Sequence, residues 1–322
     1  MQQILTFEPQ YKSVIWGGKR IAEFKGEAPA GDHVGESWEL SPVPGHESIV
    51  ADGTLKGKKF TDAVAEYPAD ILGAKIARRF DGKFPLLVKF IDSNDDLSVQ
   101  VHPDDALAMK RHGSLGKTEM WYSVAPAPGA YLYAGFSRRV GAEEFKRLVA
   151  DNEIIPALAR FDTHPGDVFY LPAGRVHSIG RGNFVLEIQE ASDITYRIYD
   201  YDRRDAQGNP RQLHIAESVD AINFDDVVPG DVLNVAPVAD KTLLLADSAY
   251  FTTEVTGVDG EMTLDLATRE SFTIVVAVKG DLDIEGPDNT VRLTQGHTAL
   301  IPASVGTVVL RGHADIVTTY IK

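Results

Sequence analysis

Short apolar runs dominate this sequence and constrain its fold more than any other feature. Each run alternates apolar and polar side chains or is apolar throughout, and Gly, Pro, Asn and Asp separate the runs. Examples are FPLLVKFID, LSVQVH, EMWYSVA, DVFYLP, NFVLEIQ, FTIVVAVKG and HTALIPA. This pattern predicts antiparallel β-sheet that closes into sandwiches or barrels. The fold class is therefore expected to be mainly β, with a few helices.

Two segments are expected to form helical insertions in the β pattern. One covers about residues 55–80 and contains FTDAVAEYPADIL, whose internal proline is expected to break the helix. The other covers about residues 141–160 and contains GAEEFKRLVADNEI. There Phe145, Leu148 and Val149 follow the i, i+3, i+4 spacing of an amphipathic helix.

The sequence contains one internal echo. GDVFYLPAGRVHSI, residues 166–179, aligns without gaps to GHTALIPASVGTVV, residues 296–309. Two copies of a strand-turn-strand unit suggest two related β modules. His177 of the first copy stands opposite Thr307 of the second. The first module is therefore the candidate functional one, and the second is expected to be degenerate.

The length supports the same division. A chain of 322 residues exceeds the usual size of one domain. We expect a catalytic module over residues 1–232, which includes the N-terminal strands and both helical insertions, and a smaller module over residues 233–322. The acidic, proline-bearing stretch at residues 224–238 is expected to link them.

Charge and composition exclude several classes of partner and chemistry. The net charge of −15 would repel nucleic acid and anionic membrane surfaces, but it permits a small phosphorylated substrate wherever basic side chains converge. The absence of cysteine excludes a disulfide framework, a thiolate nucleophile and a Cys-based zinc site. No signal peptide or membrane span is recognisable, so the expected compartment is the cytoplasm. The oligomeric state does not follow from the sequence.

Polar side chains recur on one face of two expected strands. In LSVQVHPDD, Ser98, Gln100 and His102 share a face because residues two apart in a strand point the same way. In GKTEMWY, Lys117 and Glu119 have the same spacing. A solvent-facing strand is the alternative explanation for each pattern taken alone.

A further histidine, His177, follows the Pro-x-Gly turn of LPAGRVHSIG. Gln100, His102, Glu119 and His177 together form a nitrogen and oxygen donor set suited to Zn²⁺ or a similar divalent ion. Such a set leaves a coordination position open for water or substrate. Spacing alone does not establish the site, because the four residues are far apart in the chain.

These motifs resemble known families. GDVFYLPAGRVH is similar to the second cupin motif, although Arg181 takes the place of its downstream asparagine and Asn183 follows two residues later. In their order, LSVQVHPDD, GKTEMWY, AGRVHSIG and EASDITYRIYDYDR resemble the type I mannose-6-phosphate isomerases, particularly the short bacterial form. GESWELS near the N-terminus fits the same family.

The resemblance implies a fold and an activity. The fold would be a cupin-type antiparallel barrel or jelly roll, followed by a second, smaller cupin-like module. The activity would be interconversion of mannose 6-phosphate and fructose 6-phosphate through a cis-enediol. One Zn²⁺ per chain would be bound by Gln100, His102, Glu119 and His177, although Co²⁺ and Mn²⁺ remain open as the native ion.

The resemblance also assigns residues around the substrate. Arg197 matches the arginine beside the substrate, and Lys117 matches the lysine two residues before the ligand glutamate. Glu187 matches, with a one-residue insertion, the acidic residue on the following strand. Ser98 matches the serine toward the phosphate, and Lys89 of LLVKF the basic residue of the preceding strand. The base stays open between Glu187, Lys117 and a metal-bound water, and an orienting role for Glu187 on Arg197 is equally compatible.

Some features depart from the family or remain unassigned. Larger members carry a further lysine beyond the arginine, for which only Arg203 of IYDYDRR could substitute. Arg197 and Tyr199 are expected to share a strand face. The histidines outside the motifs are expected to have surface or capping roles. Another cupin metalloenzyme, such as an Fe-dependent oxygenase, and a non-catalytic sugar-binding or regulatory protein are the alternative functions.

Overall fold

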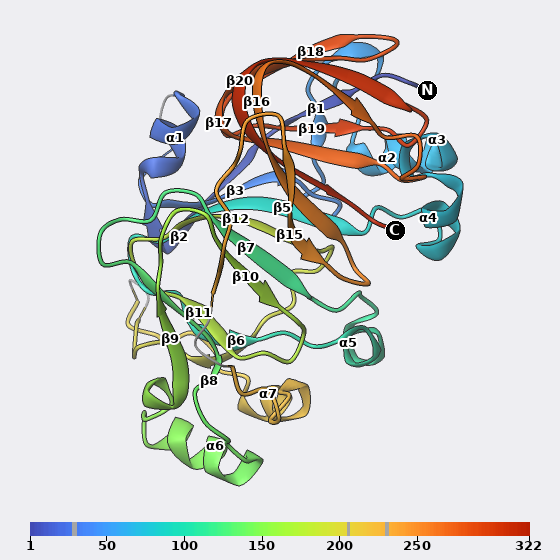
Figure 1. The fold of residues 1–322 in the computed structure, drawn as a ribbon. Helices are drawn as coiled ribbons and strands as arrows, with labels where there is room; N and C mark the ends of the chain where they lie inside the picture. Colours follow the sequence, from blue (N-terminus) through green and yellow to red (C-terminus); the bar gives the residue numbers. More distant parts are fainter. Residues whose placement is uncertain (28–30, 205–206, 229–231) are drawn as a thin grey trace. The chain divides into compact units, whose positions relative to one another are not determined.

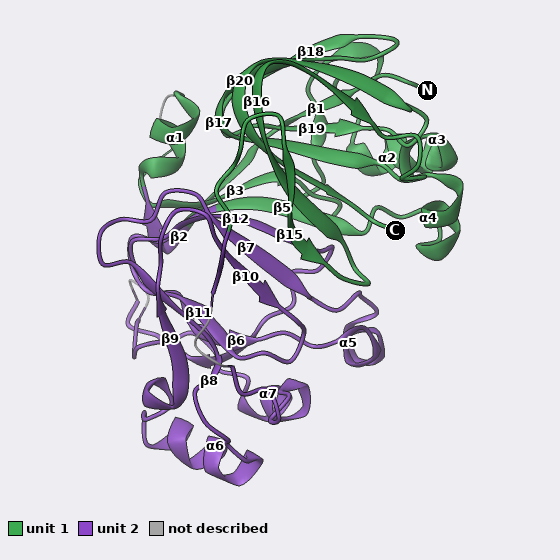
Figure 2. Ribbon diagram, viewed as in Figure 1, with its two compact units in different colours: residues 1–13, 19–90, 235–322 green, residues 14–18, 91–234 purple. Residues whose placement is uncertain are grey.

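The structure is a computed structural model, and it forms two compact units (Figure 2). It describes residues 1–27, 31–204, 207–228 and 232–322. Unit 1 comprises residues 1–13, 19–90 and 235–322, and unit 2 comprises residues 14–18 and 91–234. The expected boundary at 232/233 is close to the end of unit 2, but most of the first 90 residues group with the C-terminal segment. The compact units therefore do not follow the expected modules, whose division stays a prediction.

Unit 1 is built on an antiparallel sheet with the strand order β15-β16-β20-β17-β19-β1-β4, and β18 pairs with β17. Its strands are β1 (Leu5–Glu8), β4 (Ile49–Val50), β15 (Thr242–Asp247), β16 (Thr252–Asp265), β17 (Thr273–Glu285), β18 (Thr290–Leu293), β19 (Thr298–Ile301) and β20 (Thr307–Tyr320). Figure 1 shows the long strands β16, β17 and β20 curving together.

A β-bulge explains how β17 keeps its apolar side chains in the core. Val275 and Ala277 are fully buried before the bulge, and Leu282 and Ile284 are fully buried after it. The pairing of β17 with β20 shifts between Ala277 and Lys279. The extra residue moves the inward positions from odd to even numbers, so the same face stays apolar along the whole strand.

The rest of unit 1 consists of short helices and strands. β3 (Val34–Leu40) lies beside β5 (Leu86–Asp92), whose last two residues belong to unit 2, and β2 (Gln10–Gly18) also passes from unit 1 to unit 2. The helices are α1 (Arg20–Lys25), α2 (Phe60–Glu66), α3 (Pro68–Leu72) and α4 (Ala74–Arg79). The expected break at the proline is confirmed, because Pro68 is the first residue of α3.

Unit 2 contains two groups of strands that share a core. One has the order β14-β10-β7-β12 and the other β13-β6-β11-β8-β9. The strands are β6 (Val99–Val101), β7 (Glu119–Ser123), β8 (Tyr131–Phe136), β9 (Leu158–Asp162), β10 (Asp167–Leu171), β11 (His177–Ile179), β12 (Phe184–Glu190), β13 (Tyr196–Tyr199) and β14 (Leu233–Asn234). Trp121 and Phe169 of the first group pack in one cluster with Leu132, Phe161 and Ile179 of the second.

Helices cover the other face of the five-stranded group. They are α5 (Asp105–His112), α6 (Ala142–Ala150) and α7 (Ile215–Ala221), of which α6 and α7 are seen near β8 in Figure 1. Val99 and Val101 of β6 are fully buried in a cluster with Phe145 of α6 and Val219 of α7. The opposite face of β6, which carries the polar residues, therefore points away from these helices.

The expected helix over residues 141–160 is too long. It ends at Ala150, and β9 begins at Leu158. Asn152 has a φ of 58°, a left-handed conformation that an α-helix does not continue, and a short 3₁₀ turn from Ile155 to Ala157 follows. Among the described residues no helix has the length and apolar character needed to cross a membrane.

Both copies of the internal echo have the expected local fold. In the first copy β10 is followed by a turn and β11, and in the second β19 is followed by a turn and β20. The glycines that precede them, Gly166 and Gly296, have φ angles of 87° and 81°. His177 and Thr307 are each the first residue of the second strand. This local agreement supports a duplication, which stays a prediction.

Candidate active site

Three strands of unit 2 place polar residues in one row. Gln100 of β6 pairs with His177 of β11 on one side and with Arg197 of β13 on the other. Directly opposed residues of antiparallel strands point to the same face. Arg197, Gln100 and His177 therefore lie side by side on the face of the sheet opposite the helices.

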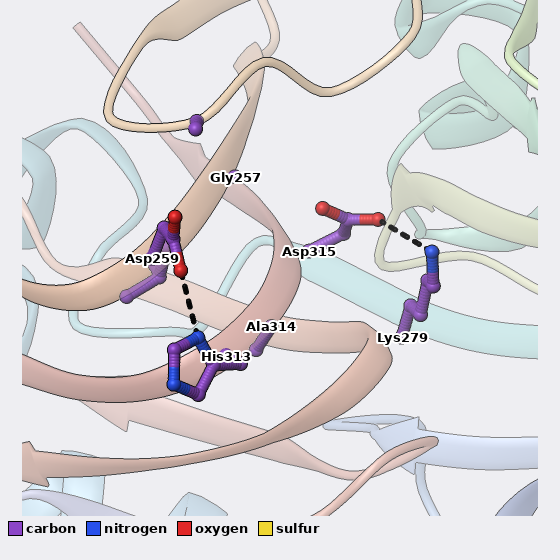
Figure 3. A pocket seen from close by; sticks show the side chains of 8 residues that line it. Gly257, Asp259, Lys279, His313, Ala314 and Asp315 are labelled. Carbon is purple, nitrogen blue, oxygen red and sulfur yellow. Dashed lines mark hydrogen bonds and ion pairs between the residues drawn. The ribbon is translucent and has the colours of Figure 1, made fainter.

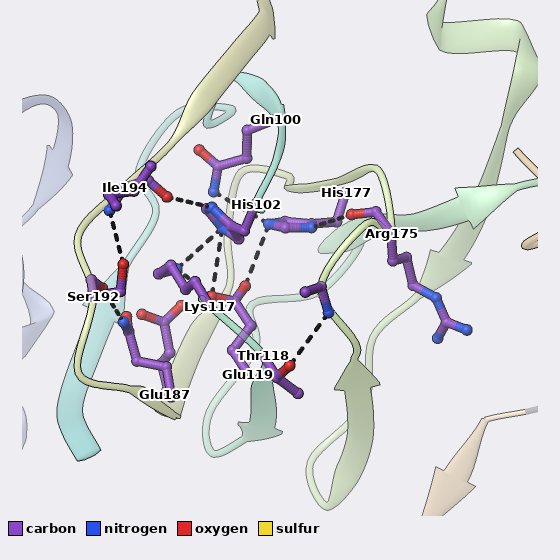
Figure 4. A network of polar contacts seen from close by, with 12 residues as sticks. Gln100, His102, Lys117, Thr118, Glu119, Arg175, His177, Glu187, Ser192 and Ile194 are labelled. Carbon is purple, nitrogen blue, oxygen red and sulfur yellow. Dashed lines mark hydrogen bonds and ion pairs between the residues drawn. The ribbon is translucent and has the colours of Figure 1, made fainter. Parts of the chain in front are cut away.

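A buried cluster lies at the end of this row (Figure 4). The side chains of His102, Glu119 and His177 are at most 2% exposed. Nε2 of His102 is 3.6 Å from Oε2 of Glu119, and Nε2 of His177 is 3.3 Å from Oε1 of Glu119. One ligand atom from each residue lies within 4.8 Å of the others. The sequence expectation that these three residues converge is therefore met.

The histidine tautomers leave ligand atoms facing the cluster. Nδ1 of His102 is 2.8 Å from the carbonyl oxygen of Ile194, and Nδ1 of His177 is 2.9 Å from that of Arg175. Because a carbonyl oxygen only accepts hydrogen bonds, each Nδ1 carries the proton and each Nε2 keeps its lone pair. Burial, followed by the charge of Lys117, lowers the pKa of His177 to about 3. The imidazole is therefore neutral and suited to metal binding.

Lys117 provides a positive charge beside the cluster. Its ammonium donates a hydrogen bond to Oε2 of Glu119 and is 3.1 Å from Nε2 of His102. Two lone pairs and a carboxylate that face one another in a buried space require a cation. The residues of this site therefore fit a divalent ion as well as the ammonium of Lys117.

Gln100 lies next to the cluster but does not have its amide oxygen turned toward it. Its Nε2 is 3.3 Å from Nε2 of His177, to which it donates. Rotation of the amide by 180° would present the oxygen at the same position. Gln100 is thus placed correctly for the predicted ligand role, which stays a prediction.

Glu187 reaches the same region from β12. It pairs with Trp121 of β7, and its Oε2 accepts a hydrogen bond of 2.9 Å from the indole Nε1. Its charge counteracts in part the lowering of the His177 pKa, so the two groups are electrostatically coupled. Figure 4 shows Glu187 in the same network as Lys117 and Glu119.

Two family models match the chain. They are described as "Phosphomannose isomerase type I, catalytic domain", over residues 4–123, and "Mannose-6-phosphate isomerase, cupin domain", over residues 240–321. The mannose-6-phosphate isomerase of Streptococcus mutans is 32% identical over 325 residues, which cover 99% of each protein. The mannose-6-phosphate isomerase ManA of Bacillus subtilis is 32% identical over 320 residues, which cover 98% of each. The chain belongs to the type I phosphomannose isomerase family.

Solved structures agree with this family assignment. The mannose 6-phosphate isomerase from Bacillus subtilis superposes with a TM-score of 0.86 at 30% identity, covering 99% of this chain and 100% of that one. A putative mannosephosphate isomerase from Archaeoglobus fulgidus has a TM-score of 0.82 at 25% identity, with coverage of 100% and 98%. The predicted family and the mainly β, cupin-type fold are confirmed.

Arg197 of β13 is half-buried. Its Nη1 donates to the carbonyl oxygen of Gln212 at 2.9 Å, and its backbone N–H donates to Nδ1 of His214 at 3.2 Å. Burial, together with the nearby Arg211, lowers its pKa. His214, expected to have a surface or capping role, thus supports the strand that carries Arg197. The sequence offered no motif that would have indicated this contact.

The expectation that Tyr199 shares a face with Arg197 is wrong. The register of β13 shifts between these residues, so that Arg197 faces Gln100 while Tyr199 faces Val99. Tyr199 packs against the cluster that contains Val99 and the helices. The bulge turns the second side chain to the opposite face, which the simple alternation of a strand does not anticipate.

The other residues to which the family resemblance assigns roles are divided between the two units. Ser98 is buried in unit 2, just before β6. Arg203 donates to Asp200 at 2.6 Å and to the carbonyl oxygen of Asp96, which precedes Ser98 in the chain. Lys89 belongs to unit 1, where its ammonium is 4.0 Å from Glu36 and lies over the Trp38 ring. The phosphate-binding roles of Ser98 and Lys89 stay predictions.

Unit 1 has a pocket of its own, of about 250 Å³, along β16, β17 and β20 (Figure 3). Asp259 is 2.8 Å from His313, and Lys279 is 4.0 Å from Asp315 across it. The part of the chain that the structure describes contains one group of three metal-ligating side chains, and that group is in unit 2. The pocket of unit 1 therefore lacks the chemistry of the candidate active site.

Proposed function

We propose that this chain is a metal-dependent aldose-ketose isomerase that interconverts mannose 6-phosphate and fructose 6-phosphate in the cytoplasm. The proposal rests mainly on the buried cluster of His102, Glu119 and His177, in which both Nε2 lone pairs are directed at the carboxylate. Family membership over the whole chain supports the substrate. Neither nucleic acid nor a membrane surface is a proposed partner.

Zn²⁺ is the ion that we propose for this cluster. His102, Glu119 and His177 would hold it, with Gln100 as the fourth ligand after rotation of its amide. When bound, the ion would polarise the O1 and O2 oxygens of the sugar as a Lewis acid. Imidazole and carboxylate ligands also suit Co²⁺ and Mn²⁺, which a metal analysis of the purified protein distinguishes.

The chain's own residues would handle charge and protons. Removal of the C2 proton of the aldose leaves negative charge on the enediol oxygens, and the guanidinium of Arg197, beside Gln100 in the row, would stabilise that charge. The same proton is then returned to C1. Glu187 and Lys117 are both buried, and either of them could carry it.

The phosphate end of the substrate would lie toward Ser98, as the family pattern implies. Ser98 stands two residues before Gln100, on the opposite side of it from His102. A sugar bound along β6 would thus have its carbonyl end at the cluster and its phosphate at the Ser98 end. Lys89 is proposed as a further phosphate contact.

The test is an assay of isomerisation of mannose 6-phosphate. We expect turnover that is abolished by a chelator and restored by Zn²⁺, and that is lost in Glu119→Gln. The matched control is Glu217→Gln, which is partly exposed in the first turn of α7 and lies outside the cluster. A zinc-loaded protein with bound metal and no turnover would overturn the proposal and favour the non-catalytic alternative.

A further inference from the structure

Two acidic residues that the proposed chemistry does not use lie behind the segment that carries Lys117. Glu190 is the last residue of β12 and is 4% exposed. Its carboxylate accepts the backbone N–H of Thr118 at 2.7 Å, and its own N–H donates to the Thr118 carbonyl oxygen at 3.0 Å. Glu190 therefore binds Thr118, the residue after Lys117, at both its N–H and its carbonyl oxygen.

Asp105 holds Gly116, the residue before Lys117. It is the first residue of α5, and its Oδ1 accepts the N–H of Gly116 at 2.8 Å. The N–H of Lys117 itself donates to the carbonyl oxygen of Pro103 at 3.1 Å. Three consecutive peptide N–H groups around Lys117 are thus each held by a separate acceptor.

The packing at Gly116 shows how closely this segment approaches α5. A Cβ atom built on Gly116 would lie 2.6 Å from the backbone nitrogen of Asp105 and 2.9 Å from the carbonyl oxygen of Pro103. Backbone atoms cannot yield to such a contact. Only glycine fits, and the Lys117 segment is therefore held directly against the start of α5.

Glu190 and Asp105 also interact with each other through their side chains. Burial, with Asp105 as the neighbouring charge, raises the pKa of Glu190 to about 8. A protonated Glu190 can donate a hydrogen bond to the carboxylate of Asp105, whereas an ionised Glu190 cannot. Asp105, from α5, is the charged group that faces Glu190, and the Thr118 peptide faces it from the β7 side.

We propose that Glu190 and Asp105 are positioning residues, which hold Gly116 and Thr118 so that the ammonium of Lys117 between them reaches Glu119 and His102. Ionisation of Glu190 puts its negative charge beside Asp105 and behind the segment. This displaces the Gly116 and Thr118 peptides, and Lys117 with them. The inference rests on the proposed function only for the role of Lys117 in turnover.

The kinetic test compares two substitutions at Glu190 in the zinc-loaded protein. In Glu190→Gln the amide oxygen accepts from Thr118 and the amide N–H donates to Asp105 at every pH. We expect its kcat near neutral pH to stay within about twofold of that of the unsubstituted protein. The alkaline decline of kcat, which should begin near pH 8 in the unsubstituted protein, should shift upward by at least one pH unit in this variant. Glu190→Ala should lose about 10–100-fold in kcat, as other substitutions behind metal-site residues do.

A second readout does not require activity. The Nζ resonance of Lys117, assigned with Lys117→Arg, should shift in Glu190→Ala and be retained in Glu190→Gln in metal-free protein. The control is Glu143→Gln on the exposed face of α6. An alkaline limb unchanged in Glu190→Gln, or an unchanged Lys117 signal in Glu190→Ala, would overturn the inference. A protein without turnover but with the expected Lys117 shifts would overturn the proposed function alone.

Discussion

Backbone carbonyl groups determine what the two site histidines can do. Ile194 and Arg175 each accept the Nδ1 proton of one imidazole, and this directs the lone pair of the other nitrogen to Glu119. A histidine of the opposite tautomer at the same position would present a hydrogen to the cluster and could not bind a cation. The proposed metal-binding chemistry thus depends on the course of the backbone as much as on the two imidazoles.

Substitution of His102 tests the proposed role of the imidazoles as metal ligands. His102→Ala removes one nitrogen ligand and leaves Glu119 with His177, so we expect Zn²⁺ affinity to fall at least about tenfold, by analogy with the 10–100-fold losses seen for supporting residues. Competition with a chromophoric chelator measures the affinity. His313→Ala is the matched control, because His313 is 80% exposed in unit 1. Equal affinity in the two variants would contradict the assigned site.

Glu190 predicts an unusual dependence of stability on pH. Its pKa of about 8 in the folded protein lies above the value near 4.3 of an unfolded chain, so between these values the folded state keeps a proton that the unfolded state loses. The contribution to the free energy of unfolding is fully present below about pH 4 and declines by up to about 1.4 kcal/mol per pH unit until pH 8. Urea unfolding at pH 5, 6.5 and 8 measures the free energy of unfolding. That of Glu190→Gln should rise relative to that of the unsubstituted protein as the pH increases. A difference between the two proteins that is the same at all three pH values would argue against a buried, protonated Glu190.

At the scale of secondary-structure elements, alternation along the strands was enough to predict much of the fold and of the site. The polar face of Ser98, Gln100 and His102 and the strand-turn-strand echo follow from local patterns. The bulge at Tyr199 does not, because a bulge is chosen by the partner strand rather than by local composition. The early end of α6 was also missed, although Asn152, which is left-handed there, is of a residue type that often ends helices.

The contact between α1 and β3 makes a prediction about stability. Lys25 of α1 and Glu39 of β3 form an ion pair of 2.7 Å whose side chains are 0% and 2% exposed. Lys25→Met leaves the carboxylate of Glu39 buried, with the Ser37 hydroxyl as its remaining hydrogen-bond donor among these contacts. The free energy of unfolding, measured in urea, should therefore fall by about 3–5 kcal/mol. Adding Glu39→Gln should recover most of the loss, because the uncompensated charge is then gone.

The neighbouring ion pair supplies the control for this prediction. Lys19 and Asp32 are 3.1 Å apart, but their side chains are 69% and 78% exposed. Lys19→Met should leave the unfolding midpoint unchanged, since exposed pairs contribute little. If Lys19→Met and Lys25→Met behaved alike, burial of the Lys25 pair would not be what makes it important.

At the scale of the whole chain, the two units have separate cores and different chemistry. The cluster of His102, Glu119 and His177 is entirely in unit 2, whereas the described part of unit 1 has no comparable group. The sequence indicated this difference, because Thr307 replaces the histidine in the second copy of the echo. It did not indicate that residues 19–90 group with the C-terminal strands, because contacts so distant in sequence leave no local pattern.

Metal binding should therefore stabilise one unit selectively. A ligand that binds only the folded state adds about 4 kcal/mol at a free concentration of 1,000 times its Kd. The proposed ligands lie on β7, on β11 and directly after β6, so Zn²⁺ should suppress local opening of these strands and slow their amide hydrogen exchange. Exchange in β16 and β20 of unit 1 should change little. Mass spectrometry of chelator-treated and zinc-loaded protein measures both, with Glu119→Gln as the control. Equal slowing in the two units, or slowing that persists in Glu119→Gln, would show that the ion acts elsewhere than at this cluster.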